Sequence, residues 1–162
     1  MQKPVVDNLS PARRSWNMAR IKSEFTLPER AVAEVLDRMG VHYTTHDRSL
    51  PGTPDLVMRQ RRKVVFVHGC FWHGHRCKRG RHVPKSNVSY WREKIRRNRV
   101  RQRAALGSLR ELGYVVSVVW ECQSQDKESL TSKLRSFLQL PQRAGIGARK
   151  EARPSHRPLS GD

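Results

Sequence analysis

The alternation of apolar and polar residues predicts a helix near the start of the chain. Over residues 26–40, apolar side chains recur at spacings that place them on one helical face. Gly40 supplies a stop for this helix. Thr26, with Glu29 three residues later, matches a capping box, in which the hydroxyl and the carboxylate each satisfy a free backbone N–H. We therefore predict a helix here, with Glu29 in a capping role.

Short apolar runs after this helix predict strands. Residues 41–46 (VHYTTH) are typical of an edge strand, and the tract Pro51–Pro54 breaks any helix before Asp55. The runs DLVM and VVFV predict two more strands, and the link RQRRK between them is short enough for a hairpin. Such a hairpin begins one strand at Asp55 and ends the next at Val67 and His68, so these residues meet at one edge of the sheet.

The second half of the sequence predicts a long helix, a strand and a closing helix. Residues 89–112 contain no Pro and only Gly107 as a breaker, and Gly113 follows as a stop. YVVSVVW is typical of a buried strand, and apolar positions between 130 and 138 repeat as in an amphipathic helix with Asp126 as its N-cap. We expect an α/β fold in which one mixed sheet is flanked by helices.

Composition narrows the class of protein. The 162 residues include 33 Lys and Arg against 14 Asp and Glu, a net charge of +19, so we expect a polyanionic partner. The length suggests one domain, which we assign to residues 26–140, with a basic N-terminal arm (1–25) and a disordered basic tail (141–162). Neither a membrane span nor a secretory signal is visible, so we expect a soluble, cytoplasmic protein.

The cysteines point to a metal. Cys70, His75 and Cys77 lie within eight residues, and Cys122 comes after a distant predicted strand. An odd number of cysteines argues against a disulfide framework, whereas three thiolates and one imidazole form the ligand set of a closed structural zinc site. We predict that these four residues bind zinc. The alternative is that buried cysteines merely lie beside solvent-facing histidines.

A second group of side chains suggests a hard divalent cation. Asp55 begins a predicted strand at the sheet edge where His68 ends its neighbour, and His73 follows closely. Hydrolysis of a phosphodiester requires a cation that neutralises phosphate oxygens and activates water, and a histidine can move protons near neutral pH. Taken singly, Asp55 is also typical of a turn, and each histidine is equally consistent with a surface or zinc-adjacent residue.

The most basic segment has the composition of a nucleic-acid surface. From position 78 to 103 the chain carries eleven Lys and Arg and a single acidic residue, a one-sided charge that suits phosphate contacts, and we place Lys94 and Arg97 among the DNA-binding residues. Trp91 lies near the start of the predicted helix. Phe71 and Trp72 are consecutive large aromatic residues that either wedge between base pairs or pack over the zinc loop.

Taken together, these segments resemble the very-short-patch-repair (Vsr-type) DNA mismatch endonucleases. The resemblance runs from about residue 15 to residue 138, and its most specific parts are HGCFWHGHRC, PGTPD and VVWEC at these separations. It implies a restriction-endonuclease-like fold and a magnesium-dependent nick on the 5′ side of the mismatched thymine in a T:G pair, which starts very short patch repair. It also implies a mismatch-repair matchmaker protein as a partner. A monomer is expected, because a mismatch marks only one strand.

The resemblance assigns roles to individual residues. Asp55 ligates magnesium, helped by the backbone carbonyl of Val67, and Glu29 is an acid near the metal. His73 acts on the attacking water, and His68 supports the phosphate or a metal-bound water. The structural zinc ligands are Cys70, His75, Cys77 and Cys122, the aromatic wedge is Phe71, Trp72 and Trp91, and Met18 of the arm inserts from the minor groove.

One position departs from the family pattern. Gln102 follows Asn98 by about one helical turn, at a place where family members carry an acid. A histidine that used such a carboxylate for orientation, or for a raised pKa, loses it here, and we expect His68 to be affected. Two further interpretations remain open. One is an endonuclease of the same fold with another mismatch, modified-base or restriction specificity, and the other is a zinc-containing basic nucleic-acid-binding protein without catalysis.

Overall fold

The structure is a computed structural model that describes Ser10 and residues 25–140. Met18 and most of the N-terminal arm, together with the tail 141–162, lie outside the described residues, so what the sequence suggests about them stays a prediction. Within the described part, no helix is both long and apolar enough to cross a membrane.

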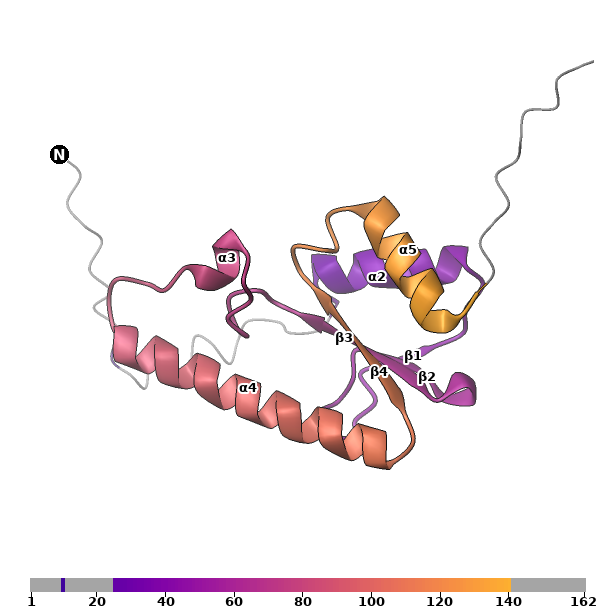
Figure 1. Ribbon diagram of the computed structural model, residues 1–162, viewed down its shortest axis with the longest axis horizontal. Coiled ribbons are helices and arrows are strands. Elements are labelled where there is room, and N and C mark those ends of the chain that lie inside the picture. The colour runs from indigo at the N-terminus through magenta and orange to yellow at the C-terminus, as the bar shows by residue number, and fades with distance from the viewer. Residues whose placement is uncertain (1–9, 11–24, 141–162) are drawn as a thin grey trace, which may run out of the picture.

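A four-stranded mixed sheet forms the centre of the fold, in the order β1-β2-β3-β4 (Figure 1). The first three strands are antiparallel neighbours, and β4 runs parallel to β3. The hairpin predicted between DLVM and VVFV is confirmed, because β2 and β3 pair directly and their link forms a short 3-10 turn, η1. The bounds are β1 Thr44–Thr45, β2 Leu56–Met58, η1 Arg59–Arg61, β3 Lys63–His68 and β4 Val115–Trp120.

Helices cover both faces of this sheet. In Figure 1, α2 (Leu27–Arg38) and α5 (Lys127–Leu138) lie together on one side, and the long α4 (Val88–Glu111) lies on the other. The alternation of side chains along β2 matches these layers: Leu56 and Met58 belong to the core under α2 and α5, whereas Val57 between them belongs to the core with α4. The predicted α/β class, one mixed sheet flanked by helices, is confirmed.

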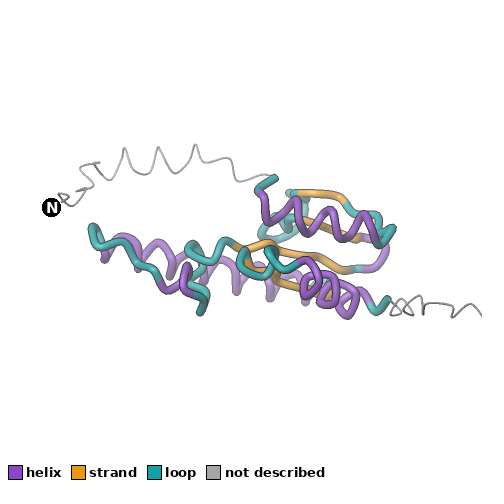
Figure 2. Tube along the Cα trace, turned by 90° about the horizontal axis from the view of Figure 1, so that it is seen from above, coloured by secondary structure: helices purple, strands orange, loops and turns teal. Residues whose placement is uncertain are grey.

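The N-terminal half of α4 extends past the sheet. Figure 2 shows the strands gathered at one end of the molecule, while α4 continues beyond them beside loop segments and the short α3 (Lys78–Arg81). The predicted helix over 89–112 is therefore confirmed to within one residue. Gly113, with φ +78°, adopts the left-handed conformation that ends the helix.

The predicted capping box forms only in its Glu29 half, and the predicted burial of the last strand is wrong. The Thr26 hydroxyl donates to Glu29 Oε1 at 2.7 Å instead of capping the helix, and Glu29 Oε2 accepts from the Phe25 N–H at 2.8 Å. A charged carboxylate is the stronger acceptor, so it takes the hydroxyl proton. The strand β4 is an edge strand and not a buried one, since it pairs only with β3 and Val115 is 55% exposed. The predicted Asp126 cap is confirmed, because its side chain accepts from two N–H groups of α5.

Candidate active site and metal centres

The parallel pairing of β3 and β4 brings three cysteines and a histidine together. His68 and Trp120 are partners in the register, so the residues that follow the two strands, Cys70 and Cys122, leave the sheet at the same edge. The loop after β3 then returns His75 and Cys77 to this point. One ligand atom from each of the four residues lies within 4.8 Å of all the others.

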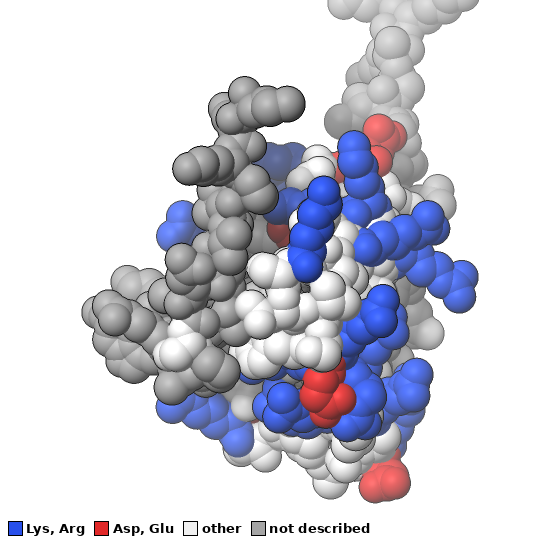
Figure 3. Space-filling view, turned by 90° about the vertical axis from the view of Figure 1, so that its left-hand side faces the viewer, with Lys and Arg blue, Asp and Glu red and all other residues white. Residues whose placement is uncertain are grey.

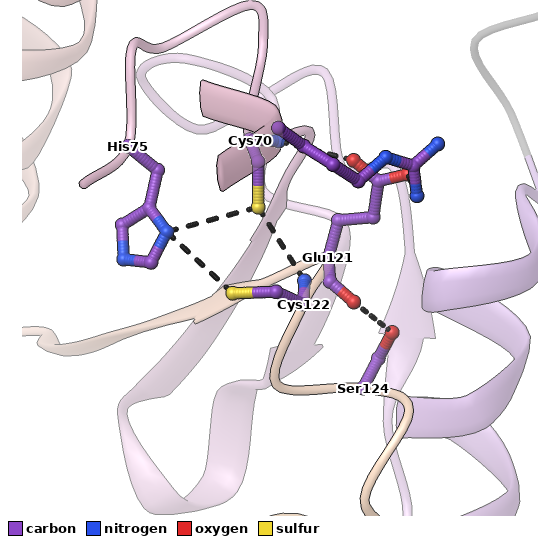
Figure 4. Close-up of polar contacts among 6 residues, drawn as sticks. Cys70, His75, Glu121, Cys122 and Ser124 are labelled. Atoms are coloured by element: carbon purple, nitrogen blue, oxygen red, sulfur yellow. Dashed lines mark hydrogen bonds and ion pairs between the residues drawn. The ribbon is translucent and has the colours of Figure 1, made fainter. Parts of the chain in front are cut away.

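The distances in this cluster suit a tetrahedral metal. Cys70 Sγ and Cys122 Sγ lie 3.8 Å and 3.5 Å from His75 Nδ1, and Figure 4 shows the three side chains pointing toward one another. Sulfur and nitrogen ligands at roughly 2.3 Å and 2.0 Å from one tetrahedral zinc ion would lie about 3.6 Å apart. The donor set and its spacing therefore fit zinc, and four protein ligands would leave no open position.

Residues around the loop that follows β3 hold the candidate metal ligands Cys70 and His75 in place. Trp120 stacks on the His75 ring, with 4.3 Å between ring centroids. Glu121 accepts from the Cys70 backbone N–H at 3.2 Å. Gly80 lies so close to the loop that a Cβ at this position would come within 2.2 Å of the His75 carbonyl oxygen. The loop is thus packed tightly around the ligands, as expected where a metal stabilises the local fold.

The thiols of this cluster differ in acidity. Burial raises the pKa of the Cys70 thiol to about 12, whereas a hydrogen bond with His75 lowers the pKa of Cys77 to about 6. Zinc binds thiolates. A bound dication would supply the positive charge that the buried Cys70 thiolate needs.

A second cluster, which we call the acidic cluster, consists of Glu29, His46 and Asp55. They come from the first turn of α2, the end of β1 and the start of β2. His46 Nε2 lies 3.4 Å from Glu29 Oε2, and His46 Nδ1 lies 3.8 Å from Asp55 Oδ1. Two carboxylates with one imidazole form a harder donor set than the cysteine cluster, and carboxylate oxygens are what Mg²⁺ prefers.

Sequence reasoning missed His46. It lies directly after Thr45, which pairs with Leu56, and its backbone N–H donates to the Asp55 carbonyl at 3.2 Å. The register of the first two strands therefore places His46 beside Asp55. The sequence alone did not set this register, because β1 spans only Thr44–Thr45 and two residues show no alternation.

Burial controls the charge of Asp55. Burial, with a smaller contribution from the nearby Glu29, raises the pKa of this carboxyl to about 6, against a hydrogen bond from the Val67 backbone N–H to Asp55 Oδ2 at 2.7 Å. This hydrogen bond confirms the prediction that Asp55 and Val67 lie together at one edge of the sheet. A bound divalent cation would favour the ionised form of both carboxylates.

The two predicted catalytic histidines lie together. The His68 and His73 rings stack with centroids 4.1 Å apart and planes 10° from parallel. Burial lowers the pKa of both, that of His68 to about 3, so both rings are neutral near pH 7. A cleft of about 460 Å³ is lined by Asp55, both histidines and, from α4, Asn98, Arg101 and Gln102.

Gln102 is the partner of both rings. Its Oε1 lies 2.9 Å from His73 Nδ1, and its Nε2 lies 3.0 Å from His68 Nδ1. The sequence predicts that His68 loses an orienting group at this position. The structure shows that an amide takes the place of the carboxylate, so the prediction that His68 lacks an orienting partner is wrong.

The aromatic residues form a cluster of their own. The Phe71 ring lies 5.0 Å from Trp72 and 5.4 Å from Trp91, measured between centroids. Trp91 is only 7% exposed, whereas Phe71 and Trp72 are half-buried. The Asn98 side chain donates to the Trp72 carbonyl at 3.0 Å. Trp91 therefore forms the base of this aromatic cluster, with the two loop residues nearer to solvent.

Positive charge surrounds this end of the molecule. Figure 3 views the molecule from the left-hand side of Figure 1, where α4 begins, and shows Lys and Arg side chains around an uncharged area with few acids. Lys94 is half-buried and Arg97 is exposed. Arg97 Nε lies 3.4 Å from Glu93 Oε1, the one acid of the basic segment. The face has the charge that a phosphate backbone requires.

Comparisons with known proteins identify the class. The family model described as DNA mismatch endonuclease Vsr matches residues 6–79. The type II nicking enzyme V.XorIIP of Xanthomonas oryzae pv. oryzae is 45% identical over 134 residues, which cover 83% of this chain and 98% of that protein. The DNA mismatch endonuclease Vsr of Escherichia coli is 42% identical over 122 residues, which cover 75% of this chain and 78% of that protein.

A solved structure, the catalytic domain of homing endonuclease I-Bth0305I, aligns with a TM-score of 0.47 and 21% identity over 69% of this chain and 93% of that domain. The sequence relatives define the class: the protein is a DNA endonuclease. More particularly, the chain belongs to the Vsr family of DNA mismatch endonucleases, as the motifs of its sequence predict.

Proposed function

We propose that this protein nicks DNA on the 5′ side of the mismatched thymine in T:G pairs, with magnesium, and so starts very short patch repair. The observation that carries the proposal is the convergence in one cleft of Asp55 with two neutral histidines, His68 and His73. The relatives named as nicking enzymes and as a mismatch endonuclease support the same reaction class.

In this proposal, the acidic cluster holds the metal. Asp55 and the backbone carbonyl of Val67 would bind Mg²⁺, and Glu29 would lie near it as a second carboxylate. The ion would neutralise charge on the phosphate and lower the pKa of a bound water. His73 takes a proton from the attacking water, and His68 contacts a phosphate oxygen.

The remaining groups hold the substrate. Phe71 and Trp72 wedge beside the mismatch, supported from below by Trp91, and Lys94 and Arg97 contact phosphates. We call Cys70, His75, Cys77 and Cys122 the zinc cluster. A zinc ion bound there would fix the loop that carries Phe71 and Trp72, since Cys70 immediately precedes them. The loop has to be rigid, because the wedge residues must supply the few kcal/mol that unstacking a base step costs.

We also propose that the protein acts as a monomer at the nucleoid. A T:G mismatch has no two-fold symmetry, so a symmetric pair of active sites would have no use for it. A mismatch-repair matchmaker protein is the further partner that we infer from the family.

The test is strand-resolved nicking of end-labelled duplexes that carry T:G, each other mismatch, a modified base or full pairing, in several flanking sequences. We expect one magnesium-dependent nick 5′ of the thymine, in T:G duplexes alone. Equal nicking of another duplex would contradict T:G specificity and favour an endonuclease of the same fold with another mismatch, modified-base or restriction specificity. Tight binding without any nick would favour a binding protein.

A further inference from the structure

Gln102 lies between the two histidines of the cleft and contacts the Nδ1 atom of each ring. Its side-chain oxygen is 2.9 Å from His73 Nδ1, and its side-chain nitrogen is 3.0 Å from His68 Nδ1. An amide offers two chemically different ends, because the carbonyl oxygen only accepts hydrogen bonds and the NH₂ group only donates them. A neutral imidazole carries its single proton on one of its two ring nitrogens.

These rules decide where the imidazole protons are. His73 Nδ1 must carry a hydrogen in order to donate to the Gln102 oxygen, and His68 Nδ1 must be free of hydrogen in order to accept from the Gln102 nitrogen. We propose that Gln102 is a positioning residue that holds His68 and His73 in opposite neutral tautomers. Turning the amide over would exchange the two tautomers but could not make them alike.

Opposite tautomers give the two rings different chemistry at Nε2, the nitrogen that Gln102 does not touch. His73 Nε2 keeps a lone pair and accepts a proton, whereas His68 Nε2 carries a hydrogen and donates it. The pair therefore presents a base and a hydrogen-bond donor side by side, and neither ring has to be charged. Applied to the proposed nicking reaction, on which this step rests, His73 takes the proton of the water and His68 donates to a phosphate oxygen.

A carboxylate at this position would give a different result. Both of its oxygens accept, so each histidine would have to present an Nδ1–H and both rings would adopt the same tautomer. While both rings stay neutral, both Nε2 atoms would then carry lone pairs, and a ring could keep an Nε2–H donor only by becoming charged, which a neighbouring carboxylate favours. An amide and a carboxylate have nearly the same shape, but only the amide gives the two rings different tautomers. Replacing Gln102 by Glu therefore tests the proposal.

The surroundings leave the rings little freedom to escape this constraint. His68 ends β3 and is only 6% exposed. Trp120 meets the edges of both rings, at centroid distances of 5.5 Å from His68 and 6.3 Å from His73. Phe66 packs against His68 at 5.7 Å. With the ring positions fixed by packing, the proton positions depend on Gln102.

The direct test is ¹⁵N NMR of the full-length, DNA-free protein with labelled histidine, near neutral pH, because long-range couplings identify the protonated nitrogen of each ring. We expect the hydrogen of His73 on Nδ1 and that of His68 on Nε2. In Gln102→Glu, His68 should shift to an Nδ1–H like His73, and in Gln102→Met both rings should become mixtures. Ala104→Glu places the same charge on an exposed position of α4 and should leave both tautomers unchanged.

Equal tautomers in the unmutated protein, or a tautomer pattern that Gln102→Glu does not alter, would overturn the proposal. Nicking supplies the second readout. We expect kcat of Gln102→Met to fall by about 10²-fold, the lower range for a lost proton-transfer group, with KM for the duplex nearly unchanged. A changed tautomer with unchanged kcat would reject a positioning role. Opposite tautomers in a protein that nicks no duplex would instead reject the proposed function and leave the tautomer assignment standing.

Discussion

The two clusters of candidate metal ligands in this protein differ in their donor atoms and in the strands that position them. The zinc cluster (Cys70, His75, Cys77 and Cys122) takes its ligands from the loop after β3 and from the segment after the parallel strand β4, and it offers three thiols and an imidazole. The acidic cluster draws its ligands from α2 and from the antiparallel strands β1 and β2, and it offers two carboxylates and an imidazole. Thiolate and imidazole donors suit a structural zinc ion, whereas carboxylate donors suit a magnesium ion that binds phosphate oxygens.

The clusters also differ in the number of protein ligands that they offer. Four protein ligands would complete the coordination of a zinc ion at the zinc cluster, whose loop packs against Trp120 and Gly80. Asp55 instead lines the cleft that His68 and His73 share. A closed site contributes to folding, whereas a site with open positions admits water and substrate. The comparison therefore assigns stability to one cluster and chemistry to the other, and the predictions below test that division.

The largest effect should come from Asp55→Asn. The variant keeps its shape but loses the charge that holds the proposed cation, so nicking of T:G duplexes should fall by at least about 10³-fold, equivalent to roughly 4 kcal/mol of lost transition-state stabilisation. Zinc content and duplex binding should remain as in the unmutated protein. A variant that also loses its zinc would show that the two clusters are not separate.

Cys122→Ser should produce the reverse pattern. It removes one thiolate from the zinc cluster, and because zinc binding is coupled to folding, zinc content should fall and the free energy of unfolding should drop by roughly 3 kcal/mol or more. Elemental analysis and urea unfolding measure both. Ser124→Ala, which removes only a hydroxyl that donates to the Glu121 carbonyl, is the matched control and should retain zinc. Full zinc content in Cys122→Ser would remove this residue from the ligand set.

Lowering the pH should protonate Asp55, and so weaken cation binding at the acidic cluster, before it protonates His68. The pKa of Asp55 is raised to about 6, so at pH 5 only about one tenth of this carboxyl is ionised, and protons compete with the cation. The magnesium concentration for half-maximal nicking should therefore be about tenfold higher at pH 5 than at pH 7. Burial lowers the pKa of His68 to about 3, which keeps that ring out of this transition. A magnesium requirement that does not change with pH would contradict the assignment of Asp55.

The smallest effect should come from Trp72→Ala, which leaves both clusters intact. Removing one wedge residue should reduce the preference for mismatched over paired duplex by roughly fivefold, about 1 kcal/mol, the lower range for stacking on an aromatic side chain. Competition binding with the two duplexes measures this ratio. Equal weakening on both duplexes would reject the wedge and favour packing over the zinc loop as the role of Trp72.

Much of this arrangement could be predicted from the sequence because it follows from strand pairing. A hairpin with a short link fixes which strand ends meet, so the approach of Asp55 to Val67 was predictable, and the cysteine spacing indicated the zinc cluster. His46 was missed because β1 has only two residues, Thr44–Thr45, too short to reveal its register by alternation. The bridge formed by Gln102 was missed for another reason: it depends on the positions of side chains from three separate segments.

The division between the two clusters can be tested most directly with one preparation of the protein, passed through gel filtration without added metal. Its zinc content is measured, and its nicking of a T:G duplex is then followed with and without magnesium. We predict one zinc ion per chain and no nicking until magnesium is added. Nicking at the full rate without magnesium, or full activity in a protein that contains no zinc, would contradict the assignment of chemistry to one cluster and structure to the other.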